Sequence, residues 1–208
     1  MKHTSIYREL LQLAVITTTL FVITQGSLQH ARVEGSSMAP TLVHGDHLVV
    51  NKLAYAQLSI PFLWTKEDPR NRLSGNYTFS APTRGDIVIF SPPNHVSLDY
   101  DLVKRILGIP GDTVVINNDG LYINGQKHIE PYLSTSDYQV AASSSISPSN
   151  VFEVKTGHYF VLGDNRGYSN DSRSWGTVSG ANITGKVWLT LPQWQIWDIP
   201  RELFPDDS

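Results

Sequence analysis

The sequence predicts a mainly β protein, in which an antiparallel-sheet domain carries a smaller inserted β region and follows one N-terminal transmembrane helix. Beyond residue 32 the chain consists of short runs rich in Val, Ile, Leu and Tyr, and Gly, Pro, Asn and Asp separate these runs. No amphipathic helical pattern of comparable quality occurs among them. An apolar stretch close to the N-terminus predicts the helix.

The apolar stretch covers residues 10–23 and is interrupted by one glutamine and three threonines. Because it is apolar on all sides, a membrane anchor is favoured over the alternative of a buried core helix, although about 20 residues are needed for a comfortable span. A cleaved signal peptide is the third interpretation, but small residues are poorly placed for cleavage after the stretch. By the positive-inside rule we expect a cytoplasmic segment at 1–9, an anchor at 10–27 and an extracytoplasmic domain at 28–208.

The strand pattern recurs along the rest of the chain. The runs lie at 47–50, 86–90, 102–107, 113–116, 121–123, 158–162 and 183–191. An Asn-Asn-Asp-Gly sequence at 117–120 predicts a hairpin turn between two of them. We expect the region from about 113 to 157 to be a non-catalytic β insertion.

Two stretches depart from this pattern. Residues 56–82 contain an apolar patch at 60–64, which is either locally packed within a surface loop or a rim that rests on the lipid interface. Residues 134–150 are rich in Ser and Ala, so they predict an extended loop within the insertion.

Composition narrows the class of function. The chain has 208 residues with a net charge of −3, 40% hydrophobic and 17% charged residues, which suits one globular unit without an electrostatic case for nucleic-acid binding. No zinc-ligand spacing or phosphate loop occurs, so neither a metal nor another cofactor is expected. Cysteine is absent, which excludes disulfides and thiol catalysis.

Ser37, about a dozen residues beyond the apolar stretch, is a candidate nucleophile close to a membrane surface. A serine hydroxyl needs a neighbour to accept its proton, and none of the seven histidines is well placed in the sequence for that role. Lys104 is the alternative base, since it shares one side of a strand with Leu102 and Ile106, and burial can lower a lysine pKa by about 3 to 5 units. The competing interpretation is a solvated Lys104-Arg105 pair on an edge strand.

The polar segment at 163–176 strengthens the case for a lysine base. Its short polar side chains are typical of a structured loop, and they supply a hydroxyl to orient an amine and a carboxylate–guanidinium pair to brace it. A calcium loop is the main rival, but Arg166 and Trp175 stand where oxygen ligands would be needed. An ordinary surface turn is the other alternative.

Together these segments resemble the bacterial type I signal peptidases, the membrane-anchored family of Ser-Lys leader peptidases. The order and spacing of the segments agree with the family's nucleophile, lysine and final boxes, which are matched by residues 33–42 with Gly45-Asp46, by residues 84–90 and 103–112, and by residues 163–176 with Gly185-Lys186. The boxes cover about a third of the chain and frame nearly all of it.

The resemblance implies that Ser37 is the nucleophile and Lys104 the general base. It also implies that the backbone N–H of Ser37 donates to the oxyanion. Many members carry a serine two residues before the nucleophile, whose hydroxyl is a second oxyanion donor. Here that position is Gly35, as in the Gram-positive style of the motif, so the second donor is left open between a backbone N–H and water.

The resemblance also implies a supporting set in the final box. These residues are Asp164, Ser169, Asp171 and Arg173. Ser169 would hydrogen-bond the lysine amine, Asp171 and Arg173 would form an ion pair, and Asp164 would order the same wall of the site.

The implied function is that of a serine endopeptidase, which cleaves signal peptides from secreted preproteins after small residues at −3 and −1. Secretory preproteins and the lipid bilayer are the expected partners, and we expect a monomer in a bacterial cell membrane that binds no nucleic acid. Two alternatives remain: a membrane-tethered β domain that binds extended peptides without turnover, and a repressor-type Ser-Lys protease that cleaves itself. The second would carry a DNA-binding domain and an Ala-Gly cleavage site, and neither is visible.

Overall fold

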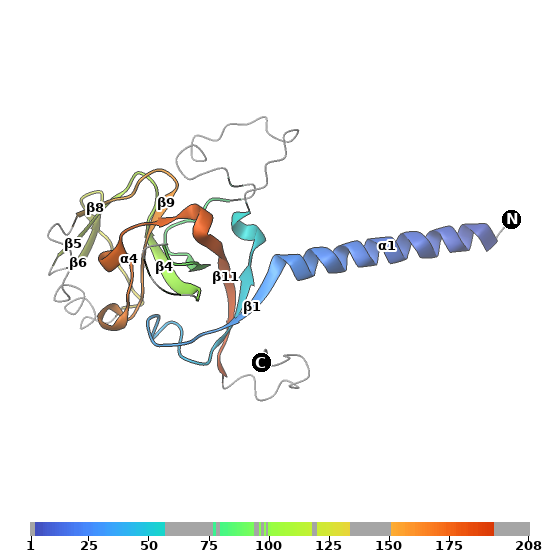
Figure 1. Cartoon of the computed structure of the whole chain (residues 1–208), viewed down its shortest axis with the longest axis horizontal. Helices are drawn as coiled ribbons and strands as arrows, with labels where there is room; N and C mark the ends of the chain where they lie inside the picture. Colours follow the sequence, from blue (N-terminus) through green and yellow to red (C-terminus); the bar gives the residue numbers. More distant parts are fainter. Residues whose placement is uncertain are drawn as a thin grey trace.

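A long N-terminal helix and a body of antiparallel strands form the part of the chain that the computed structural model describes. The described residues are 3–56, 77, 80–93, 96, 98, 100–117, 120–133 and 151–193. Helix α1 (His3–Ser27) extends away from the body, and β1 (Leu28–Arg32) continues directly from its end (Figure 1). The mainly β prediction is therefore confirmed. The patch at 60–64 and the loop at 134–150 lie outside the described residues.

Helix α1 includes the stretch predicted as an anchor, but it begins earlier, at His3. Large apolar side chains along it face the surroundings, for example Leu11, Leu13 and Phe21, which are each more than 60% exposed. The threonine hydroxyls at 17 and 19 donate to carbonyls one turn back, so these polar groups are satisfied within the helix. Within the described part of the chain, no helix combines the length and apolar character required to cross a bilayer.

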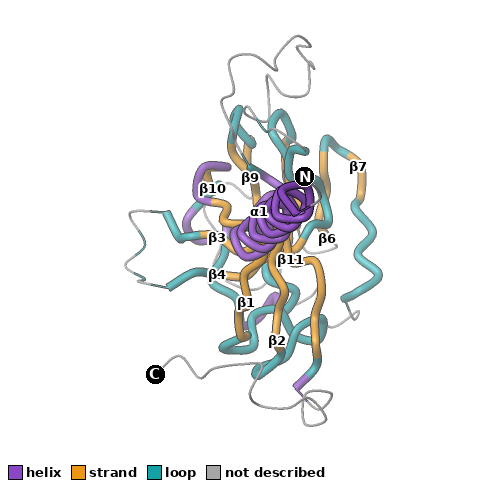
Figure 2. Tube along the Cα trace, turned by 90° about the vertical axis from the view of Figure 1, so that its right-hand side faces the viewer, coloured by secondary structure: helices purple, strands orange, loops and turns teal. Residues whose placement is uncertain are grey.

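The larger sheet has seven strands in the order β1-β2-β11-β3-β4-β9-β10, and all neighbours are antiparallel. Its remaining strands are β2 (His47–Asn51), β3 (Ile87–Phe90), β4 (Leu102–Gly108), β9 (His158–Leu162), β10 (Val178–Ser179) and β11 (Ile183–Leu191). The last strand, β11, thus lies between two early strands. In the view along α1, the helix stands in front of this sheet (Figure 2).

The smaller sheet has four strands in the order β7-β6-β5-β8. They are β5 (Thr113–Asn117), β6 (Gly120–Ile123), β7 (Gln126–Lys127) and β8 (Val151–Glu153). This sheet lies at the end of the body opposite α1 (Figure 1). It shares a buried core with the larger sheet, where Val114 and Leu121 pack with Leu107 of β4 and Phe160 of β9.

Short helical turns occupy several connections. They are η1 (Leu53–Tyr55), η2 (Arg166–Tyr168), α4 (Ser172–Trp175) and η3 (Gly180–Asn182). Asp171 caps α4 by accepting the backbone N–H of Arg173, and Gly176 ends the helix with a φ of 85°, which favours glycine.

A second core lies beneath the loop that follows β1. Alternate residues of β2, Leu48 and Val50, point into it and are fully buried, as period-2 alternation requires. Met38 and Leu42 pack there too and are 2% and 1% exposed. The residue before Met38 is Ser37, so this core fixes the backbone of the candidate nucleophile.

Candidate active site

Ser37 lies in a tight turn between β1 and β2, at residues 36–42, which we call the nucleophile turn. The N–H of Ala39 donates to the carbonyl of Ser36 at 3.1 Å, and the N–H of Leu42 donates to the carbonyl of Met38 at 2.9 Å. The Oγ of Ser37 is 2.8 Å from the Nζ of Lys104. The structure thus brings together the two residues predicted as nucleophile and base.

Lys104 is buried in the middle of the larger sheet. Its strand, β4, lies between β3 and β9, so the alternative of a solvated edge-strand lysine is wrong. The side chain is 2% exposed, and this burial lowers the pKa of Lys104 to about 8, while the carboxylates of Asp171 and Asp164 act in the opposite direction. Its Nζ also contacts the carbonyl of Val103 at 3.0 Å.

Asp171 and Arg173 form an ion pair in the wall of the site. The Nε of Arg173 donates to Asp171 at 2.8 Å, and both side chains are buried. Asp171 also accepts the N–H of Gly163 at 3.1 Å. Arg173 reaches further along the loop and donates to the carbonyls of Arg166 and Ser169 at 2.7 and 3.2 Å. The pair therefore fixes the conformation of the segment at 163–176, which we call the polar loop.

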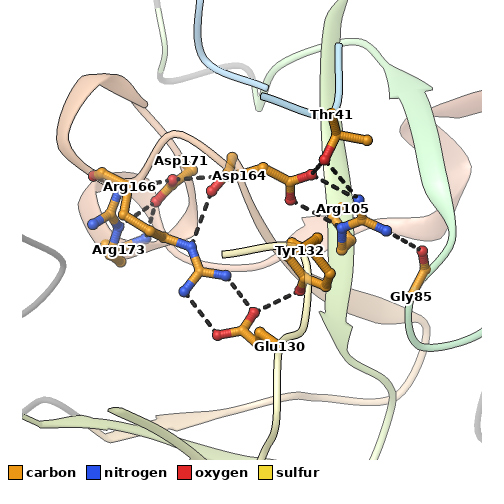
Figure 3. Close-up of polar contacts among 10 residues, drawn as sticks. Thr41, Gly85, Arg105, Glu130, Tyr132, Asp164, Arg166, Asp171 and Arg173 are labelled. Carbon is orange, nitrogen blue, oxygen red and sulfur yellow. Dashed lines mark hydrogen bonds and ion pairs between the residues drawn. The ribbon is translucent and has the colours of Figure 1, made fainter. Parts of the chain in front are cut away.

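Asp164 is the centre of a second group of polar contacts (Figure 3). It is fully buried and accepts two hydrogen bonds from the guanidinium of Arg105, at 2.9 and 2.7 Å. The hydroxyl of Thr41, in the nucleophile turn, donates at 2.5 Å to Oδ2 of Asp164, the oxygen that also accepts the shorter bond from Arg105. Arg105 also donates to the carbonyl of Gly85 at 3.0 Å. Asp164 therefore connects the nucleophile turn to the strand that carries Lys104.

The polar loop lies directly against the nucleophile turn. The backbone N–H of Asn165 donates to the carbonyl of Ser37 at 3.0 Å, and its side-chain amide donates to the carbonyl of Ser36 at 3.0 Å. Gly163 permits this approach, because a Cβ there would lie 2.4 Å from the carbonyl oxygen of Ser37 and 2.2 Å from the Oγ of Ser169.

Ser169 lies beside Gly163, with its hydroxyl oxygen inaccessible to solvent. Within the described part of the chain this hydroxyl has no hydrogen-bond partner. The contacts of the Lys104 amine in the structure are those to Ser37 and Val103. The expected bond between Ser169 and Lys104 is therefore not among the contacts formed here.

Gly35 has a backbone reason to be glycine. Its φ is 88°, in the region that favours glycine, and no atom lies within 4 Å of the position of a Cβ. Its N–H donates to the Nδ1 of His44 at 3.2 Å. Elsewhere, His30 and His47 contact each other at 2.6 Å, and the Nδ1 of His158 lies 3.1 Å from the carbonyl of Thr156. Among the described residues, no group of three or more His, Cys, Asp or Glu could hold a metal ion.

Several residues of the site were not predicted from the sequence. They are Thr41, Arg105, Glu130, Tyr132 and Arg166, all of which contact residues of the final box or each other. Thr41, Arg105 and Arg166 fall within the matched boxes, so the available signals were that position and their polar chemistry. Glu130 and Tyr132 lie in the region interpreted as an insertion, and nothing in their local sequence indicates a partner far along the chain.

Comparison with known proteins gives relatives over most of the chain. Residues 6–194 match the family described as signal peptidase, peptidase S26. Signal peptidase IB of Staphylococcus aureus is 33% identical over 211 aligned residues, which cover 96% of this chain and 95% of the relative. Signal peptidase I of Pseudomonas aeruginosa is 32% identical over 204 residues, covering 82% and 68%.

A crystal structure of a signal peptidase I from Enterococcus faecalis is also similar. It is 34% identical in sequence and superimposes with a TM-score of 0.44, over 53% of this chain and 100% of that one. The β-sheet body, together with the family match and the two signal peptidase relatives, defines a serine peptidase. The chain belongs to the signal peptidase family, peptidase S26.

Proposed function

We propose that this protein cleaves signal peptides from secreted preproteins, with Ser37 as nucleophile and neutral Lys104 as general base. The observation that carries the proposal is the 2.8 Å separation between the Ser37 hydroxyl and an amine that is 2% exposed. A buried amine loses its proton more readily, so it can accept one from serine close to neutral pH. The names of its relatives, signal peptidases I and IB, support the choice of substrate.

The mechanism starts when Lys104 accepts the hydroxyl proton of Ser37 as its Oγ attacks the scissile carbonyl carbon. The carbonyl π electrons move to oxygen, and the Ser37 N–H donates to the oxyanion. As the C–N bond breaks, protonated Lys104 gives its proton to the departing amine, which leaves an acyl-enzyme. Neutral Lys104 then takes a proton from water as the water oxygen attacks the ester carbonyl carbon. As the C–O bond to Ser37 breaks, protonated Lys104 returns this proton to the Ser37 oxygen, which restores the hydroxyl and the neutral amine. Small side chains at −3 and −1 would fit beside the serine as the substrate lies extended.

The supporting residues keep the amine in position. A neutral lysine has two N–H donors and one lone pair, and the lone pair must face Ser37. The carbonyl of Val103 can accept one N–H, at 3.0 Å. We assign the second to Ser169, because its buried hydroxyl lacks a partner in the described part of the chain, and an unpaired buried hydroxyl is costly. The Asp171–Arg173 pair and Asp164 hold the loop that carries this serine.

The second oxyanion donor cannot be a side chain of residue 35, which is glycine. Its N–H is already directed to His44. The proposed mechanism therefore relies on the Ser37 N–H, with water as the second donor.

We further propose that α1 anchors the protein in a bacterial cell membrane as a monomer, with residues 1–9 in the cytoplasm and residues 28–208 outside. Support comes from the exposed Leu, Val, Ile and Phe side chains along α1, and from its extension away from the body (Figure 1). Lys2 and Arg8 precede the apolar stretch, as the positive-inside rule favours. An anchor here would hold Ser37, ten residues after α1, close to the lipid surface.

The test is cleavage of a purified preprotein by the full chain in detergent, beside Ser37→Ala and Lys104→Ala. We expect both variants to lose processing, while the control Lys155→Ala, at an exposed lysine, keeps it. Equal processing by all variants would refute the dyad. Preprotein binding without cleavage by the unaltered protein would favour the peptide-binding alternative, and cleavage of its own chain alone would favour the self-cleaving one.

A further inference from the structure

We propose that Glu130 and Tyr132, which follow β7 in the smaller sheet, are positioning residues for the Ser37–Lys104 pair. The inserted region would then hold the active site in its working geometry and would not be a passive addition. This inference rests on the proposed function, because it concerns the rate of the same reaction. Two chains of contacts lead from Glu130 to the nucleophile turn. Figure 3 shows the second of them as far as Thr41, and the Glu130–Arg166 pair that begins the first.

The first chain of contacts begins with a buried ion pair. Glu130 is 2% exposed and Arg166 is 3% exposed. One guanidinium nitrogen of Arg166 donates to Glu130 at 2.9 Å, and the other terminal nitrogen donates to the second carboxylate oxygen. This two-point contact fixes orientation as well as distance. A buried carboxylate is costly unless it is paired, so the conformation around Glu130 depends on its contact with Arg166.

Arg166 connects this ion pair to Ser37 through the backbone of residues 163–165. Its Nε donates to the carbonyl of Gly163 at 3.0 Å, so all three of its guanidinium nitrogens are engaged. Between Gly163 and Arg166 lies Asn165, which holds the carbonyls of Ser36 and Ser37. A shift of Arg166 would therefore move the segment that lies against the nucleophile.

The second chain of contacts passes through Tyr132. Its hydroxyl donates to Glu130 at 2.6 Å, and burial raises its pKa, so it stays protonated as a donor. The guanidinium carbon of Arg105 lies 4.0 Å from the centre of the Tyr132 ring, a cation–π contact. Arg105 follows Lys104 in β4 and holds Asp164, which in turn holds Thr41.

The two chains of contacts reach the nucleophile turn at different residues. The first ends at the backbone of Ser37, and the second ends at Thr41, four residues later. Two separated contacts resist both displacement and rotation of the turn. A displacement of about 1 Å at a reacting group can reduce the rate about 100-fold, so a residue outside the reacting atoms can control kcat.

The test uses the full chain in detergent with a preprotein substrate and the variant Glu130→Gln. We expect kcat to fall about 100-fold while KM stays within about twofold, because the loss affects the transition state and not substrate binding. Circular dichroism at the assay temperature must show a folded variant. The matched control is Ile129→Thr, at a neighbouring side chain that is 81% exposed, and it should keep the kcat of the unaltered protein. An unchanged kcat in Glu130→Gln would overturn the proposal.

A double variant separates positioning from stability. Glu130→Leu with Arg166→Met removes both buried charges, and such replacements can retain or raise stability. We expect its unfolding temperature to recover relative to Glu130→Gln while kcat stays low, because the contact to Gly163 is lost. Recovery of kcat together with stability would overturn the proposal. If the double variant does not fold, Tyr132→Phe decides: we expect a fall in kcat of about tenfold, and no change would overturn it.

Ser37→Ala in the same series distinguishes failure of this inference from failure of the proposed function. If Ser37→Ala still cleaves the preprotein, the proposed function is wrong. If Ser37→Ala is inactive and Glu130→Gln has the kcat of the unaltered protein, only the positioning inference is wrong.

Discussion

At the scale of single residues, the ionisation of Lys104 should control the rate. Burial lowers the pKa of Lys104 to about 8, and in the proposed mechanism the neutral amine is the active form. Below pH 8 most of the enzyme is protonated and inactive, so kcat/KM should rise tenfold per pH unit between about pH 5.5 and 7 and level off above about pH 9. Initial rates of preprotein cleavage across this range provide the measurement. A flat profile from pH 6 to 9 would contradict a lysine base.

The same burial should reduce stability. The pKa of Lys104 is lower in the folded protein than its ordinary value of 10.5, so below pH 8 the folded state carries a charge that burial disfavours. Lys104→Met should therefore raise the free energy of unfolding at pH 7, by up to about 3 kcal/mol. The gain should shrink between pH 8 and 10.5 and vanish above, where the amine is neutral in both states. Thermal unfolding at pH 7 and pH 10 tests this, with exposed Lys155→Met as the control that should show no gain.

Gly163 is the residue whose side chain the site cannot accommodate. A methyl group would meet the carbonyl oxygen of Ser37 at 2.4 Å, and the backbone on both sides is held by hydrogen bonds. Gly163→Ala should displace the nucleophile turn and lower kcat about 100-fold in a protein that still folds. Preprotein cleavage and circular dichroism measure the two effects. Gly26→Ala, where the structure leaves open space, should have full activity, and full activity in Gly163→Ala would refute this packing argument.

At the scale of elements, alternation and turn residues were sufficient to find most strands. The run predicted at 102–107 is β4, Leu102–Gly108, and the run predicted at 183–191 is β11, Ile183–Leu191. Strand β1 was missed, because Leu28–Arg32 has mostly polar residues and pairs with one neighbour only. The strand order was not predictable, because the place of β11 between β2 and β3 depends on pairings more than 90 residues apart.

The candidate site shows the same division between local and distant information. Ser37, Lys104 and the Asp171–Arg173 pair could be named, because each lies in a segment with a recognisable local pattern. The partners of Arg166 could not, because Glu130 lies 36 residues away in a segment without such a pattern. A local pattern identifies the chemistry of a residue, and only the fold identifies the partner of a buried charge.

The contact between the polar loop and the nucleophile turn can be tested as a unit. The amide of Asn165 donates to the carbonyl of Ser36 at 3.0 Å. Asn165→Ala removes this donor and should lower kcat about tenfold. Asn165→Asp places a negative oxygen opposite a carbonyl oxygen and should lower it further, although the two side chains are similar in size. Cleavage rates that fall in the order Asn, Ala, Asp would support the contact, and equal rates for all three would refute it.

At the scale of the whole molecule, α1 and the catalytic body are structurally separate. The helix extends away from the sheets, and its apolar side chains are exposed instead of packing on the body (Figure 1). The polar contacts described for the site come from residues after β1, and the segment that follows β7 contributes Glu130 and Tyr132. Membrane attachment and catalysis should therefore be separable.

Deletion of residues 1–26 should remove membrane binding without damaging the enzyme. The truncation keeps Ser27, whose carbonyl accepts the N–H of Lys52 at 2.8 Å, so the start of β1 stays attached to the body. Because few contacts are lost, we expect the unfolding temperature to stay within about 2 °C and preprotein cleavage in detergent to keep its kcat. The full chain should co-sediment with lipid vesicles, as should the inactive Ser37→Ala control, while the truncated chain should stay in the supernatant. Sedimentation of the truncated chain with vesicles would show that the body binds lipid without α1, and a large fall in its detergent kcat would show that α1 supports catalysis directly.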